Sequence, residues 1–227
     1  MKSKTMDALT ERFIAYSREI NALELVPEGR LLKSRRLSYH FFDSGKFSSG
    51  VAIRKISSEY ARIIVENFRE DKMLAFDLLY GPPYKGTILV PSIAVALNAL
   101  GCGNINFCSS RKERKNHGEG GFHIGTPIRK GSRVLIIDDV ITAGTAIREV
   151  MTIIEQARAK AAGVIVALDR QEKGKGELSA IQEVERDFGI PVISIVKLEQ
   201  IITYLEETGS EHLDAIRTYR AQYGINS

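Results

Sequence analysis

One segment of this 227-residue chain combines an apolar run, two adjacent carboxylates and a small hydroxyl-rich loop. It extends from Arg133 to Ala146 and reads RVLIIDDVITAGTA. The apolar run predicts a buried strand that ends at Asp138 and Asp139, and a helical pattern follows the loop. The loop amides and the positive end of the helix dipole can hold a phosphate. The two carboxylates can accept hydrogen bonds from vicinal hydroxyls. We therefore expect a site for a phosphorylated sugar at this strand end.

The segment resembles the phosphoribosyl-pyrophosphate (PRPP) motif of the type I phosphoribosyltransferases, in which an apolar strand, two acidic residues and a Thr/Gly-rich loop follow one another. The alternative is an ordinary turn between a strand and a helix, with two solvated aspartates. The complete context of the motif favours the PRPP site. The resemblance implies that PRPP is held by the residues from Asp138 to Ala146, namely Asp138, Asp139, Val140, Ile141, Thr142, Ala143, Gly144, Thr145 and Ala146.

Composition sets bounds on the rest of the chain. A hydrophobic fraction of 44% and a charged fraction of 26% are ordinary for one α/β domain of this length. The net charge of +4 is too small to indicate nucleic acid by itself. The two cysteines, Cys102 and Cys108, have no metal-binding spacing and favour a reducing compartment. The chain shows neither an apolar signal core at its N-terminus nor a membrane-length apolar run, so we expect a cytoplasmic protein.

Alternating periodicities predict an α/β fold with a mainly parallel central sheet and helices on both faces. We expect strands at 76–80, 104–108, 133–137, 164–168 and 192–196, and helices at 6–21, 49–68, 88–100, 147–161 and 178–188. Residues 23–47 read as irregular to extended, with a turn at 27–29. We expect one domain over residues 1–227, with an N-terminal helix and small hood at about 1–48, a core at 49–198 and two C-terminal helices within 199–227.

Residues 109–126 are polar, rich in glycine and basic at one end, and we expect them to form a long loop without secondary structure. The alternatives are a surface insertion and a functional loop. As a functional loop, the segment could neutralise the pyrophosphate that leaves PRPP with its cationic and donor side chains, and its glycines would let it close as a lid. These side chains are Arg111, Lys112, Lys115 and His117.

A second short segment, GPPYKG at 81–86, follows a predicted strand. A tight loop at a strand end can direct backbone amides and Lys85 toward the pyrophosphate, although such a segment taken alone is most often a simple turn. Its position at the end of a parallel strand in the same predicted sheet favours the PRPP-binding role.

Four segments occur in the order GPPYKG, RKERKNHGEGG, LIIDDVITAGTA and LDRQEKGKGE, and together they resemble the orotate phosphoribosyltransferases. The resemblance implies transfer of 5-phosphoribosyl from PRPP to orotate, giving orotidine 5′-monophosphate and pyrophosphate in pyrimidine (UMP) biosynthesis. It implies a homodimer whose basic lid acts on the neighbouring subunit, and Mg²⁺ held mainly by PRPP, without direct protein ligands. It also implies that Tyr84 and Lys85 bind PRPP in cis, and that Lys115, Asp138 and Asp139 are catalytic.

The same resemblance suggests the acceptor site. Arg170 follows a predicted strand and would pair with the carboxylate of orotate, and Thr142 would lie near the base. Phe41 and Phe42 match an aromatic pair that covers orotate, and Lys33 matches a lysine that reaches PRPP. The alternatives are an ordinary surface salt bridge for the arginine and core packing for the two aromatics.

One stretch departs from the family pattern, Ser-Gly-Arg-x-Ser-Pro-Tyr. Here it reads SRRLSYH at residues 34–40, with Arg35 in place of the glycine and Tyr39 in place of the proline. Glycine tolerates and proline fixes unusual φ values, so we expect altered turn chemistry at this point.

Three alternatives stay open at this stage. The acceptor could be a purine or uracil, in which case Arg170 would have no carboxylate to bind. The chain could instead be a PRPP-sensing regulator of transcription, although we find no added DNA-binding domain and the lid keeps its lysines. It could also be one half of a bifunctional protein, although a decarboxylase-like barrel would not fit within this length.

Overall fold

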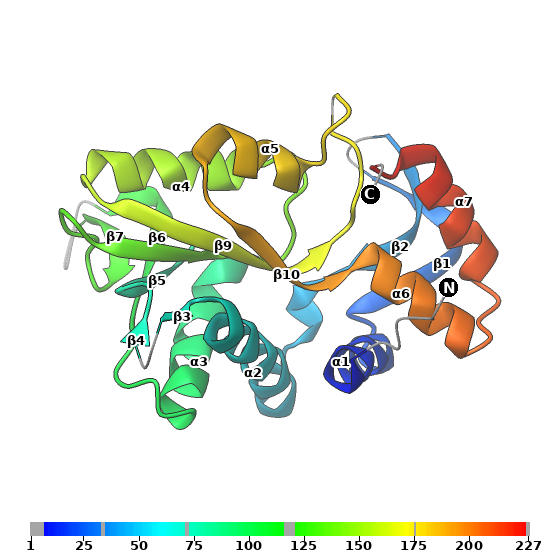
Figure 1. Cartoon of the computed structure of the whole chain (residues 1–227), viewed down its shortest axis with the longest axis horizontal. Coiled ribbons are helices and arrows are strands. Elements are labelled where there is room, and N and C mark those ends of the chain that lie inside the picture. Colours follow the sequence, from blue (N-terminus) through cyan, green and yellow to red (C-terminus); the bar gives the residue numbers. More distant parts are fainter. Residues whose placement is uncertain (1–6, 33–34, 71–72, 116–120, 175, 226–227) are drawn as a thin grey trace.

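The computed structural model describes residues 7–32, 35–70, 73–115, 121–174 and 176–225. A six-stranded sheet forms its centre, in the order β10-β9-β8-β5-β6-β7 (Figure 1). All neighbours pair in parallel except β6 and β7, which are antiparallel. This confirms the predicted mainly parallel α/β class. The strands are β5 (Leu78–Gly81), β6 (Asn106–Lys115), β7 (Gly121–Gly125), β8 (Arg133–Ile137), β9 (Lys160–Asp169) and β10 (Val192–Lys197).

Alternate side chains of the sheet pack into two separate hydrophobic cores. Leu135 and Ile137 of β8 pack in one core, and Val134 and Ile136 pack in the other. Because successive residues of a strand point to opposite faces, a strand buried on both faces reads as a continuous apolar run. Helices α2 and α3 cover the first face, and α4 and α5 cover the second (Figure 1). The four helices are α2 (Gly50–Asn67), α3 (Lys85–Ala99), α4 (Thr145–Gln156) and α5 (Ala180–Phe188).

Local signals in the sequence set several helix ends. Ser49 caps α2 by accepting a hydrogen bond from the Ala52 amide. Ser179 and Gln182 form a reciprocal capping box at the start of α5, and Gly189 ends that helix with a φ of 64°. The helices expected at 49–68 and 178–188 are therefore confirmed.

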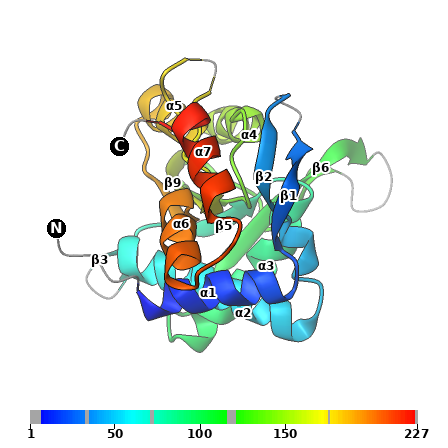
Figure 2. The same ribbon diagram turned by 90° about the vertical axis from the view of Figure 1, so that its right-hand side faces the viewer.

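The N-terminal and C-terminal segments lie together at one end of the sheet, where the β1-β2 hairpin packs beside α7 (Figure 2). Residues 23–47, expected to be irregular to extended, contain this antiparallel hairpin. Residues 27–29, expected to form a turn, lie inside β1, where the register shifts between Leu25 and Arg30 and Gly29 has a φ of 74°. The elements are α1 (Ala8–Glu19), β1 (Leu23–Leu31), β2 (Leu37–Phe42), the 3₁₀ turn η1 (Ser44–Lys46), α6 (Leu198–Glu207) and α7 (Leu213–Tyr223).

The helix predicted at 147–161 is shorter in the structure and begins earlier. Helix α4 begins at Thr145 and ends at Gln156, and β9 already begins at Lys160. The alanines of this region are good helix formers, but pairing with β8 overrides that local preference. Gly163, just beyond the predicted helix, lies inside β9, where an added Cβ would come within 2.7 Å of the Phe68 ring.

The prediction of an unstructured loop at 109–126 was wrong. Strand β6 continues to Lys115 and pairs with β7, so both flanks of residues 116–120 are β-structure. Parallel pairing of β6 with β5 ends at Ser109, and the remainder of β6 extends away from the body of the molecule (Figure 2). Backbone hydrogen bonds hold the two strands of a hairpin together, so a polar segment without apolar alternation can form a strand although its sequence resembles a loop.

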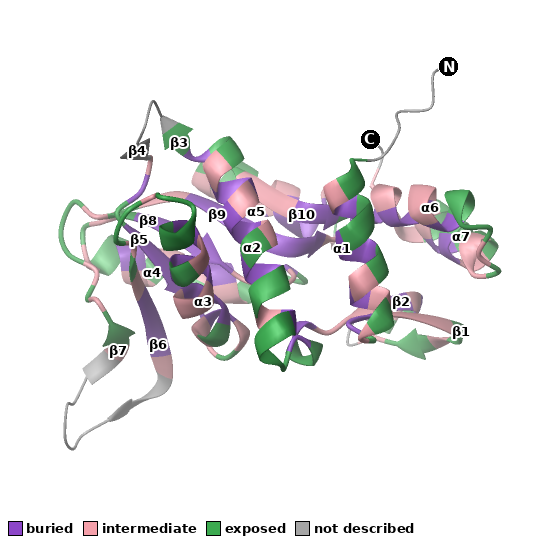
Figure 3. Ribbon diagram, turned by 90° about the horizontal axis from the view of Figure 1, so that it is seen from below, coloured by how far each residue is buried: buried purple, intermediate pink, exposed green. Residues whose placement is uncertain are grey.

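Two further short strands, β3 (Arg69–Glu70) and β4 (Met73–Leu74), pair with each other outside the main sheet. Purple buried segments in Figure 3 follow the central strands and the helix faces turned toward them. Within the residues that the structure covers, no helix is both long and apolar enough to cross a membrane.

Candidate active site

Asp138 and Asp139 lie at the carboxyl end of β8, as the apolar run predicted. Their backbone stays bonded to β9, because the Asp138 amide donates to the Ile165 carbonyl and the Ala167 amide donates to the Asp139 carbonyl. From α2, the buried Tyr60 hydroxyl donates a 2.6 Å hydrogen bond to the Asp138 carbonyl. The sheet and a helix thus fix the backbone that carries both carboxylates.

The two carboxyl groups have different environments. Burial, followed by repulsion from Asp139, raises the pKa of Asp138 to about 7. Its Oδ1 accepts a hydrogen bond from the Asp139 amide. Asp139 accepts one from the Val140 amide and a 2.6 Å bond from the Ser44 hydroxyl. The site therefore holds one carboxyl group that titrates near neutrality beside one that two donors stabilise.

The loop after the acidic pair leads directly into α4. Gly144 stands at its N-cap with a φ of 70°, in the left-handed region that glycine adopts readily, and no side chain among the described residues caps the helix. Thr142, Ala143 and Thr145 are exposed around it. Since side chains leave the first turn of α4 uncapped, its amides and the helix dipole are available to an anion.

The GPPYKG segment is a close turn between β5 and α3. A Cβ on Gly81 would lie 2.2 Å from the Gly86 carbonyl oxygen, and one on Gly86 would lie 2.6 Å from the Gly81 Cα. The glycines are therefore required for the backbone contact that closes the turn. Helix α3 begins at Lys85 rather than at the expected 88, so this lysine lies in its first turn. Tyr84 is exposed, and Ser109 of β6 donates to the Gly81 carbonyl.

The η1 turn, which sequence reasoning did not include in the site, brings these two loops together. The Lys85 ammonium forms a 2.8 Å ion pair with Asp43, whose pKa it lowers through a side-chain hydrogen bond. The neighbouring residue, Ser44, is the donor to Asp139. No motif in the sequence marks Asp43 or Ser44, because their partners lie 42 and 95 residues further along the chain.

The basic residues of the lid are only partly described. Arg111 lies in β6, and its buried Nε has no acceptor in the part of the chain that the structure covers. Lys112 and Lys115 belong to the same strand, but their side chains lie outside the described atoms. His117 lies outside the described residues, and so does Lys33, which was predicted to reach PRPP.

Arg170 follows β9 and is held in a mostly buried ion pair with Glu172, with 2.7 Å between nitrogen and oxygen. Arg170 thus forms a salt bridge, which was the alternative given for it, but this salt bridge is mostly buried and does not lie on an exposed surface. The β2 aromatics differ: the Arg30 guanidinium lies 4.0 Å above the Phe41 ring, whereas Phe42 packs against Phe47 and the core. Core packing, the alternative given for the two aromatics, is therefore observed in part for Phe42.

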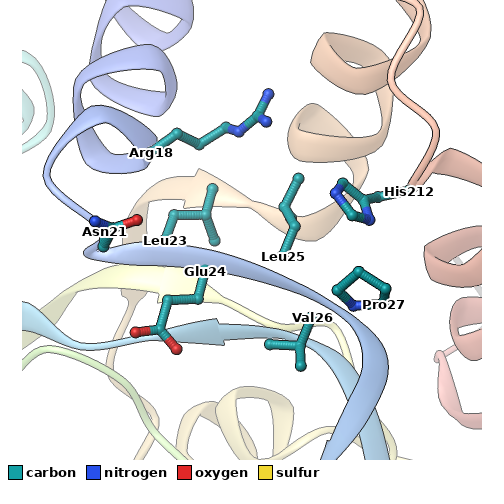
Figure 4. A pocket seen from close by; sticks show the side chains of 8 residues that line it. All are labelled: Arg18, Asn21, Leu23, Glu24, Leu25, Val26, Pro27 and His212. Carbon is teal, nitrogen blue, oxygen red and sulfur yellow. The ribbon is translucent and has the colours of Figure 1, made fainter.

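A cavity of about 300 Å³ lies elsewhere, between α1, β1 and the turn before α7 (Figure 4). None of the predicted site residues that the structure describes lines it, so we give it no part in the reaction. Its walls are formed by Arg18, Asn21, Leu23, Glu24, Leu25, Val26, Pro27 and His212.

A family model described as the phosphoribosyl transferase domain matches residues 51–192. Together with the parallel sheet and the acidic strand end, this match defines a phosphoribosyltransferase. The orotate phosphoribosyltransferase of Pseudomonas aeruginosa is 55% identical over 86% of this chain and 89% of its own, and that of Vibrio cholerae is 50% identical over 97% and 100%. The chain belongs to the orotate phosphoribosyltransferase family.

A solved structure agrees with this assignment. The crystal structure of orotate phosphoribosyltransferase from Francisella tularensis superposes with a TM-score of 0.81, at 33% identity, over 94% of this chain and 99% of that one. The protein is therefore a pentosyltransferase that moves 5-phosphoribosyl from PRPP to orotate in pyrimidine biosynthesis. This assignment replaces the alternatives of a purine or uracil enzyme and of a transcriptional regulator.

Proposed function

We propose that PRPP lies across the carboxyl ends of β8 and β5, with its 5-phosphate against the loop from Thr142 to Ala146. The uncapped first turn of α4 and the exposed threonines support this placement. Asp138 and Asp139 accept hydrogen bonds from the ribose hydroxyls and orient the sugar, while Val140 and Ile141 carry the chain between the carboxylates and the phosphate loop.

The leaving pyrophosphate meets cations from two directions in this proposal. Tyr84 and Lys85 reach it from the turn after β5, where Lys85 now pairs with Asp43. Arg111, Lys112, Lys115 and His117 approach from the β6-β7 hairpin and its tip. Negative charge builds on the pyrophosphate as the bond to ribose C1 breaks, and fixed cations stabilise that charge. Lys115 is the strongest catalytic candidate by resemblance.

Orotate binds where Arg170 can pair with its carboxylate, beside Thr142. Arg170 keeps a buried Nε without an acceptor among the described residues, which supports a role in binding an anion. Phe41 and Phe42 of β2 cover the ring in this proposal, and Lys33 reaches PRPP. Orotate then attacks ribose C1 through a ring nitrogen, so positioning and electrostatics suffice and no covalent nucleophile is required.

Mg²⁺ completes the proposal as the cofactor, in a family that is generally dependent on a divalent metal. Adjacent carboxylates are hard oxygen donors and fit a Mg²⁺ that PRPP brings in and largely coordinates itself. The described part of the chain contains no group of three or more His, Cys, Asp or Glu side chains that could hold a metal. When bound, the ion supplies charge neutralisation on the pyrophosphate oxygens.

The enzyme is proposed to act as a homodimer, with each β6-β7 hairpin serving the neighbouring site. Exposed apolar side chains along α3 support such an interface, since Tyr84, Ile88 and Val95 are 66%, 61% and 71% exposed. Their spacing places them on one side of the helix, and the first of them belongs to the PRPP-binding turn. We place the enzyme in the cytoplasm, on the basis of its pathway and of the cysteine usage.

The observation that carries the proposal is the convergence of the acidic pair, the uncapped α4 and the glycine-closed turn at one sheet edge. The test follows orotate by its ultraviolet absorbance with PRPP, with and without Mg²⁺, for the wild type and for Lys115→Ala. We expect consumption that depends on PRPP and Mg²⁺ and falls at least about a hundredfold in the variant. Undiminished consumption by Lys115→Ala would remove the lysine from the mechanism.

Mixing two inactive variants tests the action in trans. Lys115→Ala lacks the lid cation and Asp139→Asn lacks a ribose-binding carboxylate. If the lid serves the neighbour, each mixed dimer regains one complete site, and an equal mixture reaches about a quarter of wild-type activity. If the lid serves its own subunit, the mixture stays as inactive as its components.

A further inference from the structure

Two elements far from Arg170 in the sequence, β2 and α7, contact its guanidinium together with its own loop. Its Nη2 lies 2.7 Å from Glu172 Oε1, and it also donates to Ser38 of β2 at 3.3 Å and to the hydroxyl of Tyr219 of α7 at 3.4 Å. Figure 2 shows β2 and α7 beside each other at this end of the molecule. One nitrogen of the guanidinium is thus held by the hairpin, by α7 and by its own loop.

Glu172 is the centre of this arrangement. Its Oε1 also accepts a 2.9 Å hydrogen bond from Tyr219, so the acid and the phenol are bonded to each other as well as to Arg170. Its Oε2 lies 3.7 Å from Arg36. The side chains of Arg170 and Glu172 are each only 14% exposed, so solvent screens their attraction weakly. Charge-assisted bonds of this kind hold a planar guanidinium in one orientation.

The imidazole of His40 borders the same group without adding charge. Its Nε2 lies 4.0 Å from Glu172, and its ring meets that of Tyr219 edge-on, with centroids 5.5 Å apart. Burial, followed by the charge of Arg170, lowers the pKa of His40 to about 3, so it is neutral near pH 7. Glu172 is therefore not shared with a histidinium and keeps its attraction for the two arginines.

The loop that carries Arg170 and Glu172 is also tied to the end of α7. The Lys173 amide donates to the Tyr223 carbonyl, and the Ile225 amide donates to the Gln171 carbonyl. These backbone bonds fix where Tyr219 stands relative to the loop. A contact between α7 and Arg170 is therefore built into the fold on two levels, through backbone and through side chains.

We propose that Glu172 and Tyr219 are positioning residues for orotate, which hold the Arg170 guanidinium so that its remaining donors meet the substrate carboxylate. Three acceptors engage Nη2, whereas the buried Nε has none in the described chain. A buried donor without an acceptor is costly, and a ligand carboxylate would satisfy it. The inference rests on the proposed contact between Arg170 and orotate. It makes the C-terminal helix part of acceptor recognition.

The test compares Tyr219→Phe, Glu172→Gln and Arg170→Ala with the wild type, measuring kcat and the KM values for orotate and PRPP separately. Tyr219→Phe keeps the ring against His40 and removes only the hydroxyl. We expect the orotate KM to rise about fivefold in Tyr219→Phe and at least about tenfold in Glu172→Gln. The PRPP KM should stay within about twofold, because Arg170 does not touch PRPP in the proposed site.

Glu199→Gln is the matched control. Glu199 of α6 pairs with Arg220 of α7 at 3.4 Å, so this variant weakens the docking of α7 and leaves the side-chain contacts of Arg170 in place. We expect its orotate KM to match the wild type. An equal rise in this control would mean that α7 acts only as a structural support, and would overturn the inference.

The Arg170→Ala variant separates the proposed contact between Arg170 and orotate from the positioning role of Glu172 and Tyr219. If its orotate KM is unchanged, the proposed role of Arg170 fails, and the positioning role fails with it. If Arg170→Ala raises the orotate KM but Tyr219→Phe and Glu172→Gln do not, the arginine binds orotate without help and only the further inference fails. Should Glu172→Gln not fold, Tyr219→Phe decides by itself.

Discussion

The Ser44 hydroxyl donates a 2.6 Å hydrogen bond to Asp139 Oδ2, joining the turn after the N-terminal hairpin to the carboxyl end of β8. Asp139 is half-buried, and the bond leaves its carboxylate little freedom to rotate. Because Asp43 in the same turn pairs with Lys85, one short turn touches both the proposed ribose-binding and pyrophosphate-binding residues.

Ser44→Ala should therefore impair PRPP use without unfolding the protein. Loss of a hydrogen bond to a charged group costs about 1.5–3 kcal/mol, which predicts a fall in kcat/KM for PRPP of about tenfold or more. Steady-state kinetics at saturating orotate measure it. Ser48→Ala is the control, since within the described residues the Ser48 hydroxyl makes only an exposed 3.5 Å contact with the Lys46 carbonyl. Similar kinetics for the two variants would contradict the role of Ser44.

Gly81→Ala should open the turn that precedes α3. The added methyl group would lie 2.2 Å from the Gly86 carbonyl oxygen, so the backbone must move and carry Lys85 with it. Displacement of a binding group by about 1 Å can cost up to about a hundredfold, and we expect the PRPP KM to rise at least about tenfold. Gly50→Ala is the control, because a Cβ there meets no atom of the described residues within 4 Å. A wild-type KM for Gly81→Ala would show that the close contact is dispensable.

Asp138 should make the free energy of unfolding depend on pH. An unfolded aspartate ionises near pH 4, whereas the folded pKa of Asp138 is raised to about 7. The folded state binds more protons between these values, so this contribution is complete below pH 4 and is lost as the pH rises through 7. Asp138→Asn should therefore gain about 2 kcal/mol relative to the wild type between pH 5 and pH 8.

Urea unfolding at the two pH values measures this difference. Asp77→Asn is the control, because hydrogen bonding to Arg133 lowers the pKa of Asp77 and its carboxyl group stays ionised at both pH values. Its stability relative to the wild type should not change from pH 5 to pH 8. A constant difference for Asp138→Asn as well would show that its carboxyl group is not the titrating one.

Arg35→Gly should stabilise the protein. Arg35 stands where the family pattern has glycine, and its φ is 64°, in the left-handed region that glycine adopts readily. Relief of this strain exceeds the added entropy of the unfolded chain, and we expect a gain of up to about 1 kcal/mol and a Tm higher by about 2–4 °C. Arg54→Gly, within α2, should instead lower the Tm. A fall in Tm for both variants would refute the argument.

Val95→Glu should weaken the proposed homodimer. Val95 is 71% exposed on the apolar side of α3, and a buried, unpaired carboxylate opposes association. Light scattering after size exclusion should show a dimer for the wild type and monomer for the variant. Leu31→Glu changes a residue of β1 that is 69% exposed, and should remain dimeric. A dimeric Val95→Glu would place the interface elsewhere.

The sequence by itself determined the features whose signals are local. The run from Val134 to Ile137 is apolar because both of its faces are buried, and the strand bounds agree with the prediction made from it. Ser49 and Gly189 act on the nearest turn of their helices, and the helix start predicted at 49 and the helix end predicted at 188 agree closely with α2 and α5. The motifs quoted for the family resemblance are equally local, and the comparisons confirmed the family.

Only the tertiary structure decided what long-range pairing controls. Residues 109–115 contain no apolar side chain and are therefore predicted as a loop, yet Ser109, Ser110 and Lys115 pair with β7. The ties of Ser44 to Asp139 and of Tyr219 to Glu172 span 95 and 47 residues. Periodicity reports which side of an element is buried, but it does not say which distant side chain lies opposite, and the positioning of the site depends on those opposing side chains.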